Sequence, residues 1–284
     1  MLEIMKQRAK ELLESGRVVR VLGWQRGDFP NLREPVFFTT AKQLDNLEYD
    51  RFCAANLSKY LIGTDVPTLA FLKPCDTYSL NQLVKERQIN RQMTYIIGIG
   101  CEGSAKLTDM EENGTLERCL VCTKTVHAAF DELIGEDAAP REKNDRFAGV
   151  GEIEAMEIAA RYTFWQDHLA RCIRCNACRN ICPVCHCKKC VFDNTKYDTA
   201  QRANASAFEE QMFHIIRAYH VAGRCTDCGE CNRACPQAIP LHLLNRKLIS
   251  DINHMFGEYQ AGTDTETPGP LTNFDIEMDK EVGL

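Results

Sequence analysis

Apolar residues recur at helical spacing in several stretches of the chain. Leu2, Met5, Ala9 and Leu12 predict a helix over residues 2–14, with Gly16 as a stop signal. The same period predicts helices over 41–62, 153–168, 208–221 and 240–255. The helix at 208–221 has one apolar side, formed by Phe208, Met212, Ile215, Ile216 and Tyr219.

Short β-prone runs alternate with helices in the first half of the chain. Residues 18–24 and 36–39 are two such runs, and residues 68–72, 77–88 and 94–99 together predict a strand, a helix and a second strand. Strands joined by a helical crossover lie parallel and close together, so their carboxyl ends meet at one edge. We therefore expect Cys75 and Cys101, which follow the two strands, to emerge at a common edge.

Composition limits the class of protein. The 284 residues carry a net charge of −6 and 16 cysteines. The N-terminal residues do not resemble a secretory signal, and no apolar run approaches the roughly 18–20 residues that span a bilayer. We expect a cytoplasmic protein whose cysteines bind metal rather than form disulfides. The acidic balance argues against nucleic acid as a partner.

Two cysteine motifs carry the strongest chemical signal. Each has the spacing Cys-x2-Cys-x2-Cys-x3-Cys-Pro, which is typical of 4Fe–4S clusters in bacterial-type ferredoxins. In such domains the fourth cysteine of each motif binds the other cluster. The predicted ligands are thus Cys172, Cys175, Cys178 and Cys235 for one cluster, and Cys225, Cys228, Cys231 and Cys182 for the other. Structural zinc is the alternative, but it needs fewer cysteines than this.

The motifs define a domain organisation. We expect an α/β protein with an N-terminal Rossmann-like α/β domain over residues 1–134 and a linker over 135–151. A helical dicluster ferredoxin-like domain follows over 152–256, and residues 257–284 form an extended tail that is either disordered or laid along a partner. The Gly-x-Gly-x-x-Gly pattern of residues 98–103 lacks a following helix, so it does not indicate a nucleotide.

Eight cysteines remain outside the two motifs. Cys75, Cys101, Cys119 and Cys122 are predicted to hold a third 4Fe–4S cluster; the alternative is that they are separate thiols. A fourth cluster would need Cys185, Cys187, Cys190 and Cys53. Cys53 lies on a predicted apolar helix, where a cysteine is commonly a packed core residue. Five cationic residues around the first motif (Arg171, Arg174, Arg179, Lys188 and Lys189) either offset cluster charge or dock an acidic carrier.

Several sequence segments together resemble one known family. They are Lys73-Pro-Cys-Asp76, the segment Ile97–Gly103, Cys119-x2-Cys122, and the two cluster motifs with the Cys-Pro-Val-Cys-His-Cys run. The arrangement is similar to the β-subunit family of coenzyme F-420 (deazaflavin) hydrogenases and formate dehydrogenases, including its bacterial branch associated with heterodisulfide-reductase-like complexes. The resemblance implies FAD and a cluster in the α/β domain, whose ligands match Cys75, Cys101, Cys119 and Cys122.

We therefore predict an iron–sulfur electron-transfer subunit of a cytoplasmic anaerobic oxidoreductase complex. Its partners would be catalytic and flavin or iron–sulfur subunits, and ferredoxin is a candidate carrier. The alternative is a flavin-containing β subunit that itself oxidises or reduces a soluble electron carrier. A zinc-bound structural module is a third interpretation. The visible spectrum separates the three, because clusters, flavin and zinc absorb differently.

Overall fold

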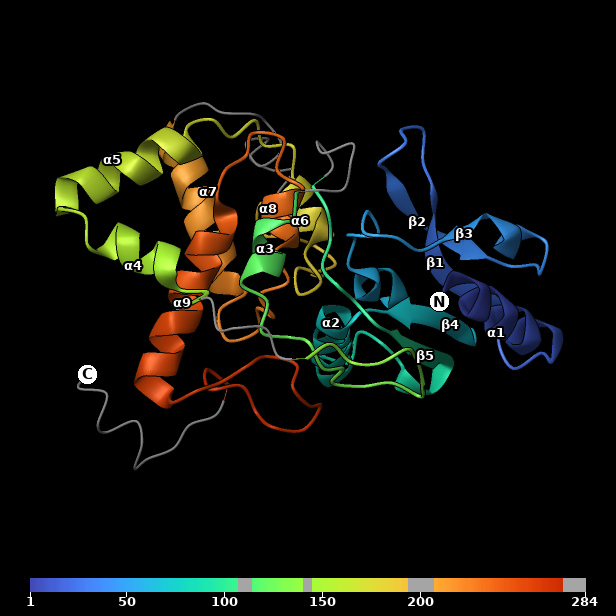
Figure 1. The fold of residues 1–284 in the computed structure, drawn as a ribbon. Coiled ribbons are helices and arrows are strands. Elements are labelled where there is room, and N and C mark those ends of the chain that lie inside the picture. The colour runs from blue at the N-terminus through green and yellow to red at the C-terminus, as the bar shows by residue number, and fades with distance from the viewer. Residues whose placement is uncertain (107–113, 140–144, 194–206, 273–284) are drawn as a thin grey trace. The chain divides into compact units, whose positions relative to one another are not determined.

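The computed structural model describes residues 1–106, 114–139, 145–193 and 207–272 (Figure 1). The chain divides between Asn144 and Asp145 into two compact units, and the short segment Gly262–Glu266 belongs to the first. This division lies inside the predicted linker 135–151. Residues 148–151, however, begin a helix instead of continuing the linker.

The first unit is built on a mixed six-stranded sheet with the order β2-β1-β4-β5-β6, and β3 pairs with β1. Its strands are β1 (Arg20–Arg26), β2 (Arg33–Phe38), β3 (Leu47–Glu48), β4 (Thr68–Leu72), β5 (Thr94–Ile99) and β6 (Glu132–Ile134). Its helices are α1 (Leu2–Glu14), α2 (Pro74–Lys85) and α3 (Glu117–Leu120), with short 3-10 turns at Gln43–Asn46, Leu57–Leu61 and Arg91–Met93.

The predicted strand–helix–strand segment is confirmed. Strands β4 and β5 pair in parallel, with Thr68 opposite Thr94 and Leu72 opposite Gly98, and α2 connects them. The first two strands, β1 and β2, do not follow the parallel strand order of a Rossmann-like sheet. Residues 27–32 join β1 to β2 in a tight turn closed by a hydrogen bond between Gly27 and Leu32, and so short a connection makes the pair antiparallel.

The predicted helix over residues 41–62 is wrong. Two 3-10 turns and the short strand β3 occupy that stretch instead. Local side-chain bonds explain the difference, because Asp50 accepts from the backbone of Phe52 and Asn56 accepts from the backbone of Ser58. Such bonds compete with the helical pattern even where apolar residues keep the helical period.

The second unit is helical. Its elements are α4 (Ala148–Glu154), α5 (Ile158–Leu169), α6 (Ala177–Ile181), α7 (Ala207–His220), α8 (Glu230–Arg233) and α9 (Leu241–Phe256). Helix α7 packs against α5 and α9, and α6 packs against α8. The single helix predicted over 153–168 is two helices, because the chain leaves helical geometry between Glu154 and Ile158.

Part of the predicted tail has a defined place. Thr263 accepts a hydrogen bond from Asn81, and Asp264 forms an ion pair with Lys85, so this segment lies along α2 of its own chain. The backbone of Tyr78 leaves no room for a side chain at Gly262, which has a positive φ of +79°. Residues 273–284 of the tail, and most of the predicted loop 191–205, lie outside the described residues.

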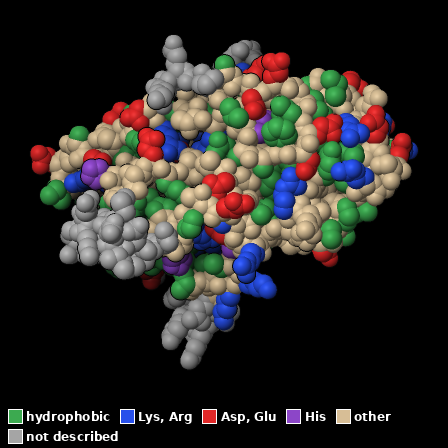
Figure 2. Space-filling model, turned by 90° about the horizontal axis from the view of Figure 1, so that it is seen from below, with side chains coloured by type: hydrophobic (Ala, Val, Ile, Leu, Met, Phe, Trp, Pro, Cys, Tyr) green, Lys and Arg blue, Asp and Glu red, His purple; other side chains and the backbone are tan. Residues whose placement is uncertain are grey.

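The surface carries both signs of charge. On the face drawn in Figure 2, acidic and basic side chains are interspersed, and hydrophobic side chains reach the surface among them. In the part of the chain that the structure describes, no helix is long and apolar enough to cross a membrane.

Candidate metal centres

The two ferredoxin-like motifs form loops with the same backbone conformation. Arg174 and Asp227 occupy equivalent positions with φ of 49° and 51°, and Asn176 and Gly229 follow with φ of 60° and 68°. A short helix then begins in each copy, α6 after Asn176 and α8 after Gly229. Left-handed residues turn the chain tightly, so the three cysteines of each motif are presented from a single curved loop.

An ion pair anchors each loop to a long helix, with opposite polarity in the two copies. In the first loop Arg174 Nε lies 2.8 Å from Glu210 Oε2 on α7. In the second loop Asp227 Oδ1 lies 3.0 Å from Arg246 Nε on α9. Arg179 also pairs with Asp193. Two of the five cationic residues expected near the first motif therefore have carboxylate partners.

The fourth cysteine of the second motif lies with the first motif. A small cavity is lined by Cys172, Cys175, Cys178 and Cys235, together with His214. Burial raises the pKa of the Cys178 thiol, and negative charge on Cys235 and Cys175 raises it further. The geometry thus brings together the four cysteines predicted for one cluster.

The reciprocal arrangement holds for the second motif. Burial raises the pKa of Cys228 and of Cys231, and in both cases Cys182 and Cys225 add to the shift through their negative charge. Cys182 comes from the first motif, so each group of four takes one member from the other copy. Asn245 on α9 donates a hydrogen bond to Cys231 Sγ over 3.5 Å.

These environments fit an anionic cofactor. Burial alone keeps the thiols protonated, whereas a coordinated metal ion deprotonates them. The buried guanidinium of Arg217, which is 2% exposed, has three nitrogens without a hydrogen-bond partner among the described residues. Both ring nitrogens of His214 are likewise buried without a partner there. Among the same residues, no three His, Cys, Asp or Glu side chains surround a point where a single metal ion would sit.

The first unit brings a further set of cysteines to the predicted sheet edge. Cys75 lies in the first turn of α2 directly after β4, and Cys101 follows β5. Burial and then the charge of Asp76 raise the pKa of Cys75, and Cys101 contributes to the same shift. Burial raises the pKa of Cys101, and negative charge on Cys119, on α3, adds to that shift. The structure thus supports the closeness of these three; Cys122 lies three residues beyond Cys119.

Backbone amides of one loop point at two of these sulfurs. Gly103 N–H donates to Cys101 Sγ over 3.4 Å, and Ser104 N–H donates to Cys119 Sγ over 3.3 Å. The Cys122 thiol instead donates a hydrogen bond to the Lys124 carbonyl, with Sγ and the oxygen 3.6 Å apart. Amide donors stabilise negative charge on sulfur, which suits a thiolate-ligated cluster.

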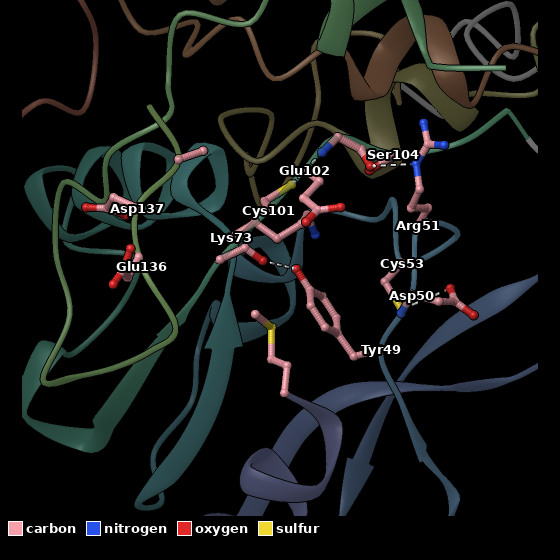
Figure 3. Close-up of a pocket in the computed structure, with 14 residues that line it drawn as sticks. Tyr49, Asp50, Arg51, Cys53, Lys73, Cys101, Glu102, Ser104, Glu136 and Asp137 are labelled. Atoms are coloured by element: carbon pink, nitrogen blue, oxygen red, sulfur yellow. Dashed lines mark hydrogen bonds between the residues drawn. The ribbon is translucent and has the colours of Figure 1, made fainter. Parts of the chain in front are cut away.

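A cavity of about 610 Å³ adjoins Cys101 (Figure 3). Tyr49 and Cys53 line it from the segment after β3, and Glu136 and Asp137 from the segment after β6. Tyr49 donates a hydrogen bond of 2.6 Å to the Gly100 carbonyl. Nothing in the sequence pattern pointed to the segment 136–138 as part of a site, whereas Tyr49 and Cys53 lie in the stretch 41–62 that was predicted to be a helix.

Lys73 is the one cation of this cavity that is almost fully buried, at 2% exposed, among the described residues. Its Nζ lies 3.0 Å from Asp76 Oδ2, bonds the Ala55 carbonyl, and sits 4.3 Å from the centre of the Trp24 ring. Burial lowers its pKa, but the charges of Asp76, Cys75 and Cys101 reverse the effect and raise the pKa overall. Lys73 belongs to the Lys-Pro-Cys-Asp segment singled out in the sequence.

The four cysteines expected to hold a fourth cluster fall in different units. Cys53 is buried in the apolar core of the first unit, 1% exposed, and bonds to the Glu48 carbonyl and Asp50. Cys185, Cys187 and Cys190 belong to the second unit, where Cys185 packs beside Cys182 and Cys187 is exposed. The fourth cluster stays a prediction.

Comparison with known proteins gives one family match within the second unit and two relatives that align with most of the chain. Residues 168–239 match a family model described as a 4Fe-4S dicluster domain. The F420-dependent formate dehydrogenase subunit beta of Methanocaldococcus jannaschii is 24% identical over 358 aligned positions, covering 94% of this chain and 93% of the relative.

A second relative, the F420-dependent formate dehydrogenase 1 subunit beta of Methanococcus maripaludis, is 24% identical and covers 92% of this chain and 91% of its own length. The first alignment has 358 positions against 284 residues here, so at least 74 positions of it have no counterpart in this chain. The similarity nevertheless covers more than nine-tenths of this chain and of each relative, so the chain is similar over nearly its whole length to F420-dependent formate dehydrogenase beta subunits.

Proposed function

We propose that the protein is an iron–sulfur electron-transfer subunit of a formate dehydrogenase-type oxidoreductase complex. The crossed grouping of the cysteines supports this most directly: Cys235 lines one cavity with Cys172, Cys175 and Cys178. Cys182 lies with Cys225, Cys228 and Cys231. The match of residues 168–239 to a 4Fe-4S dicluster domain supports the same assignment.

The protein's own residues supply what an electron-transfer cluster needs. Thiolates hold the iron, the apolar side chains of Leu169, Phe213, Ile239 and Leu241 shield it, and buried polar groups adjust its charge balance. When bound, the clusters would accept and release single electrons. The relatives are named as beta subunits, which supports a partner subunit that carries the catalytic centre.

The ligand assignment is tested by replacing one cysteine in each group. Cys178→Ser and Cys228→Ser should each lose about four irons per chain, measured after anaerobic purification, because a cubane rarely survives the loss of a thiolate ligand. Ala177→Ser, beside Cys178, is the matched control and should retain the full iron content. Full iron in both cysteine variants would contradict the assignment.

A third cluster on Cys75, Cys101, Cys119 and Cys122 is part of this proposal. Two observations support it: backbone N–H groups donate hydrogen bonds to the sulfurs of Cys101 and Cys119, and the buried Lys73 lies nearby. Both the hydrogen bonds and the cation favour an anionic group at this edge of the sheet. The variant Cys101→Ser should lose this third cluster, while the electron paramagnetic resonance spectra of the other two clusters stay unchanged.

A second candidate function is that the first unit also binds a flavin and reacts with a soluble carrier. The cavity beside Cys101 favours it, because about 610 Å³ lies within the usual range of ligand pockets. The positions of the relatives that have no counterpart in this chain weigh against it. Flavin absorption in the spectrum of purified protein, together with flavin released on denaturation, would establish this function. Their absence would leave electron transfer alone.

A further inference from the structure

Helix α7 has charged and polar side chains on its buried side. Glu210, His214 and Arg217 are 0%, 1% and 2% exposed, although all three side chains are ionisable. Two residues of its apolar side, Phe208 and Tyr219, are each 66% exposed. The buried side of α7 therefore carries three ionisable groups beside the apolar Phe213 and Ala218.

Two of the three buried ionisable groups are accounted for. Glu210 pairs with Arg174 at 2.8 Å, and His214 is neutral, because burial and then the charges of Arg217 and Arg174 lower its pKa to about 3. Arg217 has no such partner among the described residues, since none of its guanidinium nitrogens forms a hydrogen bond there. Glu230, another fully buried carboxylate of this unit, pairs with Arg233.

The position of Arg217 on the helix places it between the two groups of cysteines. Phe213, four residues before it, packs in an apolar cluster with Cys178 and Cys231. Val221, directly after the last residue of α7, packs with Cys182, Cys185 and Cys225. Residues four apart lie on one face of a helix, about 6 Å apart along its axis. Arg217 thus faces the space between the first group and the second.

The charge of Arg217 responds to both groups. Burial alone lowers the pKa of its guanidinium, but negative charge on Cys231, Cys178, Cys182 and Cys185 outweighs burial and raises the pKa above its ordinary value. A buried cation without an opposite charge costs several kcal/mol, so it persists only where something compensates it. Thiolate-ligated clusters carry net negative charge and are the compensating groups that this unit would provide.

We propose that Arg217 is a counter-charge shared by the two clusters of the second unit, and that it raises the reduction potential of both. The inference rests on the proposed iron–sulfur function. Reduction adds one electron to a cluster that is already negative, so a fixed cation nearby stabilises the reduced form more than the oxidised form. A single buried charge between two clusters acts on each of them.

The test uses the full chain, purified anaerobically, with two neutral variants and one that keeps the charge. Arg217→Met and Arg217→Gln remove the charge, whereas Arg217→Lys retains it. Arg161→Gln is the matched control, because Arg161 is a partly exposed arginine on α5, eleven residues before the first predicted ligand Cys172, and water screens its charge. Iron per chain is measured first, and the midpoint potential of each cluster is then measured by redox titration followed by electron paramagnetic resonance.

With iron unchanged, each neutral variant should lower both midpoint potentials by the equivalent of at least a tenfold change in the one-electron equilibrium constant, which is 59 mV. The lysine variant and the control should stay close to the natural protein. If both neutral variants lose iron while the lysine variant keeps it, the counter-charge is needed for cluster binding itself, and the proposal is upheld.

The proposal would be overturned by unchanged potentials in an iron-replete neutral variant, by a shift confined to one cluster, or by equal effects of lysine and methionine. Loss of iron from the lysine variant as well would also overturn it, because charge would then not be the property that matters. Failure of the proposed function looks different, since the natural protein itself would then show neither iron nor cluster signals.

Discussion

At the scale of single residues, the two cluster loops show how one backbone is made with different side chains. Their left-handed positions are filled by Arg174 and Asn176 in one copy and by Asp227 and Gly229 in the other. Asparagine and glycine are the residues that tolerate this conformation best. The ion pairs explain the other two residues, because each pairs with an opposite charge on a long helix.

The loop conformation predicts which substitutions at Gly229 are tolerated. Gly229→Asn copies the first loop and should cost little, whereas Gly229→Val should cost about 1–2 kcal/mol or more, because a β-branched residue is strained at a φ of 68°. Thermal unfolding followed by loss of cluster absorbance measures the difference. Equal midpoints for the two variants would show that the left-handed conformation is not required.

Residue spacing in the sequence predicts much of the second unit's site. It predicts the crossed partners Cys182 and Cys235, because ligand spacing is a covalent property of the chain. It did not indicate Arg217 or His214, since these lie within an apolar period and their importance depends on what packs against them. The segment 136–138 beside Cys101 was also missed, because only the parallel pairing of β6 with β5 brings it there.

At the scale of elements, α7 shows the limit of a hydrophobic pattern. The pattern predicts a helix over 208–221 correctly, and α7 spans Ala207–His220. The apolar side that it identifies is largely exposed, because periodicity shows that two faces differ but does not show which one faces inward. Where thiolates and ionic groups form the interior, the charged face is the buried one.

The buried ion pair that anchors α7 gives an element-scale prediction. Glu210→Leu should destabilise the second unit by about 3–5 kcal/mol, because it leaves Arg174 buried without its partner. The double variant Glu210→Leu with Arg174→Leu should be more stable than the single one, since both charges are then removed. Thermal unfolding of the four proteins completes the cycle. A double variant as unstable as the sum of the singles would contradict the coupling.

At the scale of the whole molecule, the cysteines set an iron count. The two groups of the second unit predict about 8 irons per chain, a third cluster in the first unit predicts about 12, and a fourth would give about 16, at four irons per cluster. We expect at least 12 in anaerobically purified protein. A value near 8 would exclude the third cluster, and one near 12 would exclude the fourth.

The chain should work within a larger assembly. Its relatives are named as beta subunits, and α7 exposes Phe208, Met212, Ile215 and Tyr219, an apolar surface of the kind that soluble proteins usually cover. Size measurement on native extracts should place it well above the 32.2 kDa of the single chain. A catalytically competent monomer would contradict this expectation.

The crossed pairing of Cys182 and Cys235 also constrains the order of events during synthesis. The first motif is complete by Cys182, yet the cavity formed by its first three cysteines is closed only by Cys235. A ribosome must therefore add 49 further residues, up to Cys231, before the second site has all four thiols, and 53, up to Cys235, before the first site does. Until then the nascent chain exposes thiols that are prone to oxidation. Cluster insertion therefore has to wait until both cysteine motifs have been synthesised, and the two sites then become ready for iron almost together.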